Sequence, residues 1–294
     1  MPHKAGFVNI IGNPNVGKST LMNAMIGENL SVITSKAQTT RHRILGIVNG
    51  TDFQIVYSDT PGILKPGYKL QEYMLKFSSS ALVDADMILY VTDVKEMPVE
   101  DGEIIERMKK IKVPVYVLIN KIDLGDEKTV KTLISNWSGI LPNAEAIPIS
   151  ATEKFNLDKV FALILEKLPE SPPFYPKEEL TDKSERFFVS EIIRGKILQN
   201  YSKEIPYSVE VEVESFKETR EMIRIRSIIY VERESQKGIL IGHQGRSLKK
   251  VGTQAREDME DFFQKKIFLE TMVKVKKDWR NDDRTLKQFG YNQK

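Results

Sequence analysis

The chemistry that this sequence can perform is concentrated in eight residues near the start of the chain. They follow the pattern G-x-x-x-x-G-K-S and read Gly12-Asn13-Pro14-Asn15-Val16-Gly17-Lys18-Ser19, with Thr20 next in the chain. A glycine-rich loop between a strand and a helix points backbone N–H groups and the positive end of the helix dipole at an anion. The pattern therefore predicts nucleotide binding, in which Lys18 reaches the β- and γ-phosphates and the Ser19 hydroxyl is a ligand of Mg²⁺.

A second chemical signal follows an apolar segment at 54–58. The residues after it are Asp59, Thr60, Pro61 and Gly62. An aspartate here can hold Mg²⁺ through water, and the glycine amide can approach a γ-phosphate. Read alone, the tetrapeptide is a common turn, so its position downstream of the phosphate loop gives it most of its meaning.

A third signal, Asn120-Lys121-Ile122-Asp123, follows the apolar segment 115–119. One carboxylate can accept from both N1–H and the N2 amino group of guanine. Adenine lacks this donor pair, so Asp123 would select guanine. Lys121 would lie over the base, and Asn120 would tie the loop to the phosphate loop; a helix-capping aspartate is the alternative. A later strand ends at Ser150-Ala151, where a backbone N–H could meet guanine O6.

These motifs need a scaffold that brings them to one edge. Strand-like segments alternate with helix-like segments over residues 1–170, which predicts βαβ units and a mostly parallel, three-layer α/β domain. Its ligand should lie beyond the carboxyl ends of the strands. The expected strands are 7–11, 44–48, 53–58, 87–94, 113–120 and 146–150, and the expected helices are 18–26, 69–83, 100–110, 128–138 and 156–168.

With its motifs in this order, the segment 1–170 resembles a translation-factor-type GTPase. The resemblance places the first switch at residues 38–42 and implies that Thr40, with Thr39 as the alternative, closes onto Mg²⁺ and the γ-phosphate. The implied metal ligands are Ser19, Thr40 and Asp59. The implied catalytic residues are Lys18, Thr40 and Gly62, acting on GTP and leaving GDP.

One departure from Ras-like relatives concerns the residue after Gly62. Those enzymes place a water-orienting glutamine there, whereas this chain has Ile63, whose aliphatic side chain cannot orient water. We therefore expect slow, Mg²⁺-dependent intrinsic hydrolysis, helped by a partner or a cation. Some relatives use an asparagine at the position of Asn15 to bind K⁺, so K⁺ is a further expected cofactor.

Composition limits the remaining possibilities. A length of 294 residues suits two domains, and the absence of cysteine excludes disulfides and thiolate metal sites. The three histidines have no metal-ligand spacing. The N-terminus leaves no room for a signal peptide before the first strand, and the most apolar segments are only strand-length. We expect a cytoplasmic protein.

Charge is unevenly distributed along the chain. The net charge is +3, yet residues 237–294 carry 14 Lys and Arg against 8 Asp and Glu. A basic excess of this kind favours a polyanion, either nucleic acid or an anionic membrane surface, and a solvated charged face is the alternative.

A proline-rich segment, 169–176, and the polar residues after it predict a linker at 171–185 between a domain at 1–170 and a second at 186–294. The second domain has helical spacing at 185–201, a strictly alternating strand at 207–214 and a second, antiparallel strand at 222–232. A long helix to about residue 263 and a strand at 266–276 complete an α+β pattern.

The segment Gly242-His243-Gln244-Gly245 lies between an apolar stretch and a basic helix start. In this setting it resembles the G-x-x-G loop of a type II KH domain, which clamps about four nucleotides of single-stranded RNA. A helix–turn–helix corner with a solvated basic face is the alternative. The residues expected to contact RNA are Ile239, Ile241, Gly242, His243, Gln244, Gly245, Arg246, Lys249 and Lys250.

A GTPase domain followed by a type II KH domain resembles the Era family of bacterial GTPases. The resemblance implies a monomeric, GTP-switched protein that binds the single-stranded 3′ end of 16S rRNA and assists maturation of the 30S ribosomal subunit. Two alternatives stay open. One is a tRNA-modification or large-subunit GTPase, and the other is a peripheral membrane GTPase that binds anionic lipid weakly through its basic C-terminal face.

Overall fold

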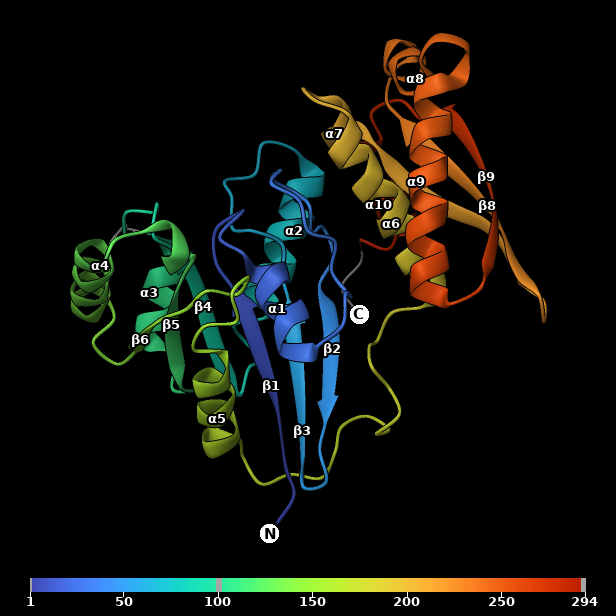
Figure 1. Ribbon diagram of the computed structural model, residues 1–294. Helices are drawn as coiled ribbons and strands as arrows, with labels where there is room; N and C mark the ends of the chain where they lie inside the picture. Colours follow the sequence, from blue (N-terminus) through green and yellow to red (C-terminus); the bar gives the residue numbers. More distant parts are fainter. Residues whose placement is uncertain (1, 99–101, 292–294) are drawn as a thin grey trace. The chain divides into compact units, whose positions relative to one another are not determined.

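The computed structural model describes residues 2–98 and 102–291, which form two compact units (Figure 1). The first unit contains the chain up to Pro66 together with Met74–Asp182. The second contains Gly67–Tyr73 together with the chain from Lys183 onward. Each unit has its own sheet and is described separately below.

The first unit is built on a six-stranded sheet in the order β2-β3-β1-β4-β5-β6. The pair β2–β3 is antiparallel and all other neighbours are parallel, which confirms the predicted mostly parallel sheet. The strands are β1 (Lys4–Ile11), β2 (Ile44–Asn49), β3 (Phe53–Asp59), β4 (Met87–Asp93), β5 (Val115–Asn120) and β6 (Glu145–Pro148).

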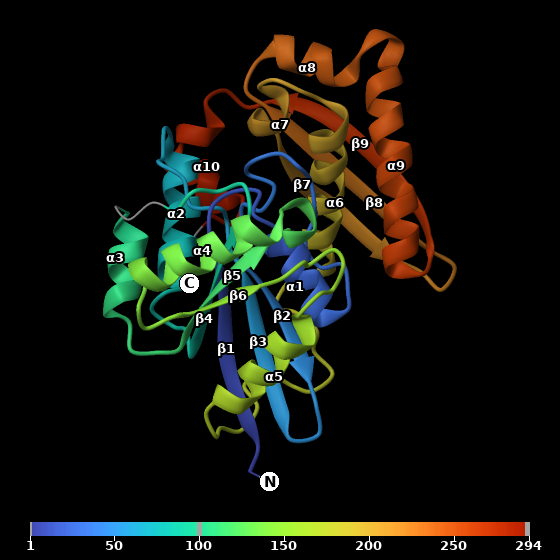
Figure 2. The same ribbon diagram turned by 60° about the vertical axis from the view of Figure 1, so that its left-hand side comes forward.

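Helices flank this sheet (Figure 2). The apolar sides of α3 and α4 pack on alternate residues of β4 and β5, among them Ile88, Tyr90 and Val117. Every residue of β4 and β5 is buried, as expected for central parallel strands that are covered on both faces. The helices are α1 (Lys18–Ile26), α2 (Lys69–Ser80, of which the residues up to Tyr73 belong to the second unit), α3 (Glu103–Lys110), the 3₁₀ turn η1 (Ile122–Leu124), α4 (Glu127–Ile140) and α5 (Leu157–Lys167).

Most predicted elements of this unit agree with the structure to within a few residues. The strand predicted at 113–120 begins at Val115, and the helix predicted at 69–83 ends at Ser80. The predicted helix start at residue 100 lies outside the described residues, and α3 begins at Glu103. No helix among the described residues is long and apolar enough to cross a membrane.

Residues 174–182, which the sequence predicts to be linker, lie along the edge strand β2 and belong to the first unit. Ile47 N donates to Leu180 O at 2.8 Å, and Leu45 N donates to Asp182 Oδ1 at 3.0 Å. The side chain of Gln54, which is fully buried, accepts from the backbone N–H of Phe174 at 2.7 Å. We call residues 174–182 the strap, because they satisfy donors that an edge strand otherwise exposes.

The second unit has a three-stranded sheet in the order β7-β8-β9. The pair β7–β8 is antiparallel, as predicted, and β8–β9 is parallel with Met222 opposite Lys266. Helices α6 and α9 cover one face through Ile193, Val251 and Met259. The elements are α6 (Glu185–Asn200), α7 (Ile205–Ser208), β7 (Glu210–Glu218), β8 (Met222–Val231), α8 (Glu234–Ile241), η2 (His243–Gly245), α9 (Arg246–Phe263), β9 (Lys266–Val275), η3 (Trp279–Asn281) and α10 (Asp283–Gln288).

The strand predicted to begin at Tyr207 begins at Glu210 instead. Tyr207 and Ser208 belong to the short helix α7, whose first turn contains Pro206. A proline favours the first turn of a helix because its fixed φ is helical and its missing N–H has no partner there. Alternation of apolar and polar residues was therefore a poor guide to this boundary.

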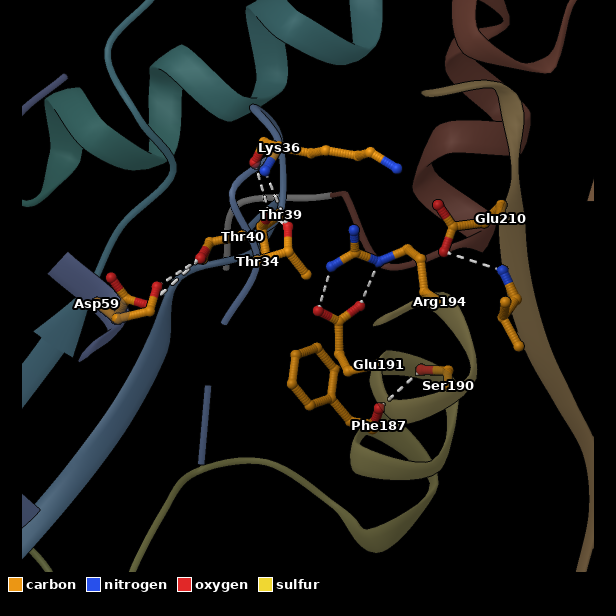
Figure 3. Close-up of polar contacts among 12 residues, drawn as sticks. Thr34, Lys36, Thr39, Thr40, Asp59, Phe187, Ser190, Glu191, Arg194 and Glu210 are labelled. Carbon is orange, nitrogen blue, oxygen red and sulfur yellow. Dashed lines mark hydrogen bonds and ion pairs between the residues drawn. The ribbon is translucent and has the colours of Figure 1, made fainter. Parts of the chain in front are cut away.

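The C-terminal segment closes the core of the second unit in a way that the sequence analysis did not predict. Trp279 and Tyr291 are fully buried. The Trp279 indole N–H donates to Ser208 O at 3.0 Å, and the Tyr291 hydroxyl donates to Glu210 Oε2 at 2.7 Å. The same unit contains a buried ion pair, in which Arg194 Nε donates to Glu191 Oε1 at 2.8 Å (Figure 3).

Candidate functional site

The phosphate loop connects β1 to α1 and takes a shape that requires glycine at Gly17. This residue has φ of 99°, in the left-handed region that side chains rarely adopt. A Cβ atom there would lie 2.3 Å from Asn120 Nδ2. Gly17 therefore permits both the turn into α1 and the approach of the guanine loop.

Lys18 lies inside this loop with only 6% of its surface exposed. Its ammonium donates to Asn13 O at 2.7 Å. Burial lowers the pKa of Lys18 to about 8, while the carboxylates of Asp59 and Glu96 act in the opposite direction. A cation held in a desolvated loop of this kind interacts strongly with a polyphosphate.

The three predicted metal ligands lie together, although they come from α1, the segment before β2 and the end of β3. Figure 3 shows Thr40 beside Asp59. Ser19 Oγ is 2.7 Å from Asp59 Oδ2 and 2.9 Å from Thr40 Oγ1. Thr40 Oγ1 is 3.3 Å from the same carboxylate oxygen. Thr39, the alternative to Thr40, instead bonds Thr34 Oγ1 and Lys36 O, both at 2.6 Å.

This cluster suits a hard divalent cation. Asp59 is fully buried, its Oδ1 has no hydrogen-bond partner among the described residues, and burial raises the pKa of its carboxyl group. An orphaned carboxylate oxygen beside two hydroxyl groups is an oxygen-only donor set, which Mg²⁺ prefers. Ser19, Thr40 and Asp59 would therefore hold Mg²⁺ between the protein and the phosphates.

The predicted guanine loop is braced against the phosphate loop. Asn120 Nδ2 donates to Val16 O at 2.9 Å, and its Oδ1 accepts from Ala151 N at 3.0 Å. The Ser150 hydroxyl donates to Asp123 Oδ1 at 2.6 Å. Lys121, in the left-handed conformation with φ of 60°, donates from its ammonium to Asn15 O at 2.6 Å. The structure thus brings all these predicted residues to one site.

A cavity of about 330 Å³ opens beside Lys18 and Ser19. The amide of Ile63 donates to Gly12 O at 3.1 Å, which holds the segment after Asp59 against the phosphate loop. Sequence reasoning missed the wall formed by residues 32–36, because no motif marks it. The lining residues are Pro14, Asn15, Gly17, Lys18, Ser19, Thr20, Val32, Ile33, Thr34, Ser35, Lys36, Gln38, Thr39, Thr40, Thr60, Gly62 and Lys121.

The predicted G-x-x-G loop connects α8 to α9 in the second unit. Gly242 and Gly245 have φ of 72° and 74°. A Cβ on Gly242 would lie 2.2 Å from Ser247 Oγ, whereas the space beside Gly245 is open. Arg246, Lys249 and Lys250 are exposed around the start of α9, where they can reach a phosphate.

A groove of about 340 Å³ begins at this loop and continues between α9 and β9. Its apolar floor is Leu248 and Leu269, and Lys249 and Arg256 are its cations. Ile239 and Ile241, which the sequence predicts to contact RNA, do not line it: Ile239 is 51% exposed and Ile241 packs against the core. The remaining lining residues are Gly245, Gly252, Thr253 and Thr271. No sequence motif marks this floor, because Leu269 on β9 comes beside Leu248 on α9 only when the chain has folded.

Comparisons with known proteins agree with both halves of this description. The family model described as 50S ribosome-binding GTPase matches residues 7–121, and the one described as KH domain matches residues 204–280. GTPase Era of Clostridium kluyveri is 46% identical over 290 residues, covering 98% of this chain and 99% of the relative. GTPase Era of Staphylococcus haemolyticus is 45% identical over 98% of this chain and 97% of the relative.

Two solved structures extend the likeness to three dimensions. A crystal structure of Era in complex with MgGDPNP and nucleotides 1506–1542 of 16S ribosomal RNA has a TM-score of 0.94 at 38% identity, covering 99% of this chain and all of that one. A variant of Aquifex aeolicus Era bound to GDP and AlF₄⁻ also has a TM-score of 0.94, at 39% identity, with the same coverage.

Proposed function

The chain belongs to the Era family of GTPases, and from that premise we propose that it is a nucleotide-switched clamp for ribosomal RNA. Its first unit binds and hydrolyses GTP, and its second unit holds the single-stranded 3′ end of 16S rRNA during maturation of the 30S subunit. The observation that carries this proposal is the full-length likeness to an Era complex with MgGDPNP and a 16S rRNA segment.

In the proposed reaction the chain's own residues hold the triphosphate and shape its surroundings. Lys18 keeps its bond to Asn13 O and directs its other two N–H donors at the β- and γ-phosphates, and Thr40 closes over the γ-phosphate beside Ser19. The Gly62 amide donates to the same phosphate. Mg²⁺ held by Ser19, Thr40 and Asp59 would neutralise the charge on the phosphate oxygens.

Intrinsic hydrolysis is slow in this proposal, because Ile63 has no polar group with which to orient the attacking water. Ile63 packs against the apolar cluster formed by α3, α4 and the sheet, so its side chain contributes to stability. An activating partner or cation then supplies the missing electrostatic stabilisation.

We propose K⁺ as that cation, bound near Asn15. This residue lines the cavity and has φ of 65°, and its carbonyl oxygen already accepts a hydrogen bond from the Lys121 ammonium. GTP turnover should be faster in K⁺ than in Na⁺ at equal ionic strength, and Asn15→Ala should remove the difference. Equal turnover of the unmodified protein in the two salts would exclude K⁺.

The RNA is proposed to bind along the groove between α9 and β9. The G-x-x-G loop, with His243 and Gln244 at its tip, would clamp the backbone, and Arg246, Lys249, Lys250 and Arg256 would supply charge. The bases would lie on Leu248 and Leu269. Ile239 and Ile241 flank this groove in the proposal and do not form its floor.

The deciding experiment measures binding of a labelled oligonucleotide that matches the 3′ end of 16S rRNA, with GTP analogue, with GDP and without nucleotide. We expect tight, sequence-dependent binding that the GTP analogue strengthens. Gly245→Asp should abolish it, because the variant adds a negative charge and a side chain at positive φ. Gly139→Asp, at an exposed position of α4 with open space around it, is the matched control.

Weak binding that depends neither on the RNA sequence nor on the bound guanine nucleotide would refute the RNA clamp. The basic excess of residues 237–294 would then favour the second candidate, a peripheral GTPase on anionic lipid, which vesicle flotation would test directly. A large-subunit role is supported only by the match of residues 7–121 to the family of 50S ribosome-binding GTPases. We propose that the protein acts as a cytoplasmic monomer, and that any membrane association is weak.

A further inference from the structure

The segment from Thr92 to Glu96, at the end of β4, contacts both nucleotide loops of the first unit. No sequence motif marks this segment. Its backbone forms a tight turn, in which Glu96 N donates to Asp93 O at 3.1 Å and Lys95 N donates to Asp93 Oδ1 at 2.9 Å. The turn points the carboxylates of Asp93 and Glu96 at different loops.

Glu96 reaches the phosphate loop. Its Oε1 accepts from the side-chain amide of Asn13, and its Oε2 accepts from the hydroxyl of Thr92, which is fully buried, at 2.8 Å. The carbonyl of the same Asn13 accepts the ammonium of Lys18 at 2.7 Å. Glu96 therefore fixes the position of Asn13, whose carbonyl in turn accepts a hydrogen bond from the Lys18 ammonium.

Asp93 reaches the guanine loop. Its Oδ2 accepts from the Lys121 ammonium at 2.7 Å, and the Asp93 side chain is only 10% exposed. Lys121 also donates to Asn15 O, and Val94 N donates to Asn120 O at 3.2 Å. These bonds fix the end of β5 and the direction of the Lys121 side chain.

We propose that Asp93 and Glu96 are positioning residues for nucleotide binding, Glu96 acting through Asn13 and Asp93 through Lys121. Neither carboxylate lines the cavity beside Lys18. Two anions close to a polyphosphate site repel the phosphates and by themselves weaken binding. Their presence here is explained if they hold the donors of the site in place. Charge-assisted hydrogen bonds to both loops reduce the ordering that binding would otherwise require.

Two double-mutant cycles test this inference on the full-length protein, with GDP affinity and GDP dissociation rate as the measurements. Glu96→Ala and Asn13→Ala should each weaken GDP binding about tenfold, and the double variant should lose about the same tenfold. Asp93→Ala and Lys121→Ala should likewise be non-additive. Additive losses within a pair, or losses below about twofold, would overturn the positioning role.

Two further measurements separate positioning from general loosening of the fold. Glu96→Gln, which keeps one acceptor oxygen, should recover part of the affinity that Glu96→Ala loses. The Glu96 variants should weaken the binding of GDP more than the binding of GMP. Asp93→Ala should weaken the binding of both nucleotides equally, since Lys121 is expected to lie over the guanine base. Equal effects of Glu96→Ala on GDP and GMP would overturn the assignment to the phosphate loop. Glu106→Gln, on the exposed side of α3, is the matched carboxylate control.

Discussion

The residue with the most informative environment is Lys18, a buried cation whose pKa is lowered to about 8. Above that pH the nucleotide-free protein loses the proton, and binding of a polyphosphate must take it up again. GDP affinity should therefore be constant below about pH 8 and fall above it, approaching tenfold per pH unit. This dependence of GDP affinity on pH is measured by titrating the protein with GDP at several pH values between about 7 and 9, with saturating Mg²⁺.

Lys18→Arg is the control for this prediction, because a guanidinium keeps its proton throughout the range. Its affinity for GDP will be lower but should not change with pH. A slope of the same size in Lys18→Arg, or none in the unmodified protein, would contradict the assignment to Lys18.

The strap, residues 174–182, shows how one element completes another. Gln54 accepts from Phe174 N and Tyr175 N and donates to Tyr175 O, at 2.7–3.0 Å. Gln54 is fully buried, and Gln54→Ala would remove its three hydrogen bonds to part-buried backbone groups of the strap, which should destabilise the first unit by about 1–3 kcal/mol. Lys177→Ala, which removes exposed bonds of the same strap to Gly50 and Thr51, should cost less than about 0.5 kcal/mol.

Urea unfolding followed by fluorescence measures this difference. The chain has two tryptophans, Trp137 in the first unit and Trp279 in the second, so a Trp279→Phe background reports the first unit alone. Equal midpoints for Gln54→Ala and Lys177→Ala would show that the hydrogen bonds between Gln54 and the strap do not stabilise this unit. Strand β2 begins at Ile44, four residues after Thr40, so a loose strap should also weaken closure of the first switch.

At the scale of the whole molecule, the phosphate site belongs to the first unit and the G-x-x-G groove to the second. If GTP and RNA bind to one chain with one site each, their mutual effects must be equal. We predict that the factor by which a GTP analogue tightens RNA binding equals the factor by which saturating RNA tightens the analogue. Two titrations, each with and without the other ligand, measure both factors.

GDP provides the comparison, since it should tighten RNA binding less than the analogue does. Unequal factors would contradict a closed cycle with one nucleotide and one RNA per chain. Equal factors of about one would mean that the two units bind independently.

Residues that carry local chemistry were predictable from the sequence. The phosphate loop, Asp59 and the Asn120–Asp123 motif each depend on a strand, a turn and the residues next to it, and all lie at one edge of the sheet. Helix α1 begins and ends at the predicted residues, and Gly27 caps it with φ of 84°. These features are decided by interactions between residues close in the chain.

Only the tertiary structure decided the features that join distant segments. Thr40, and not Thr39, places its hydroxyl beside Ser19 and Asp59, because Thr39 is held by Thr34 and Lys36. The strap pairs residues about 120 positions apart, as in Gln54 with Tyr175, and the buried Trp279 donates its indole N–H to the carbonyl of Ser208. Each of these features depends on which donors and acceptors from distant segments come within hydrogen-bonding distance when the chain folds. The sequence by itself determined the nucleotide motifs and the order of the elements, whereas burial and hydrogen-bond satisfaction between distant residues decided the strap, the RNA groove and the supports of both nucleotide loops.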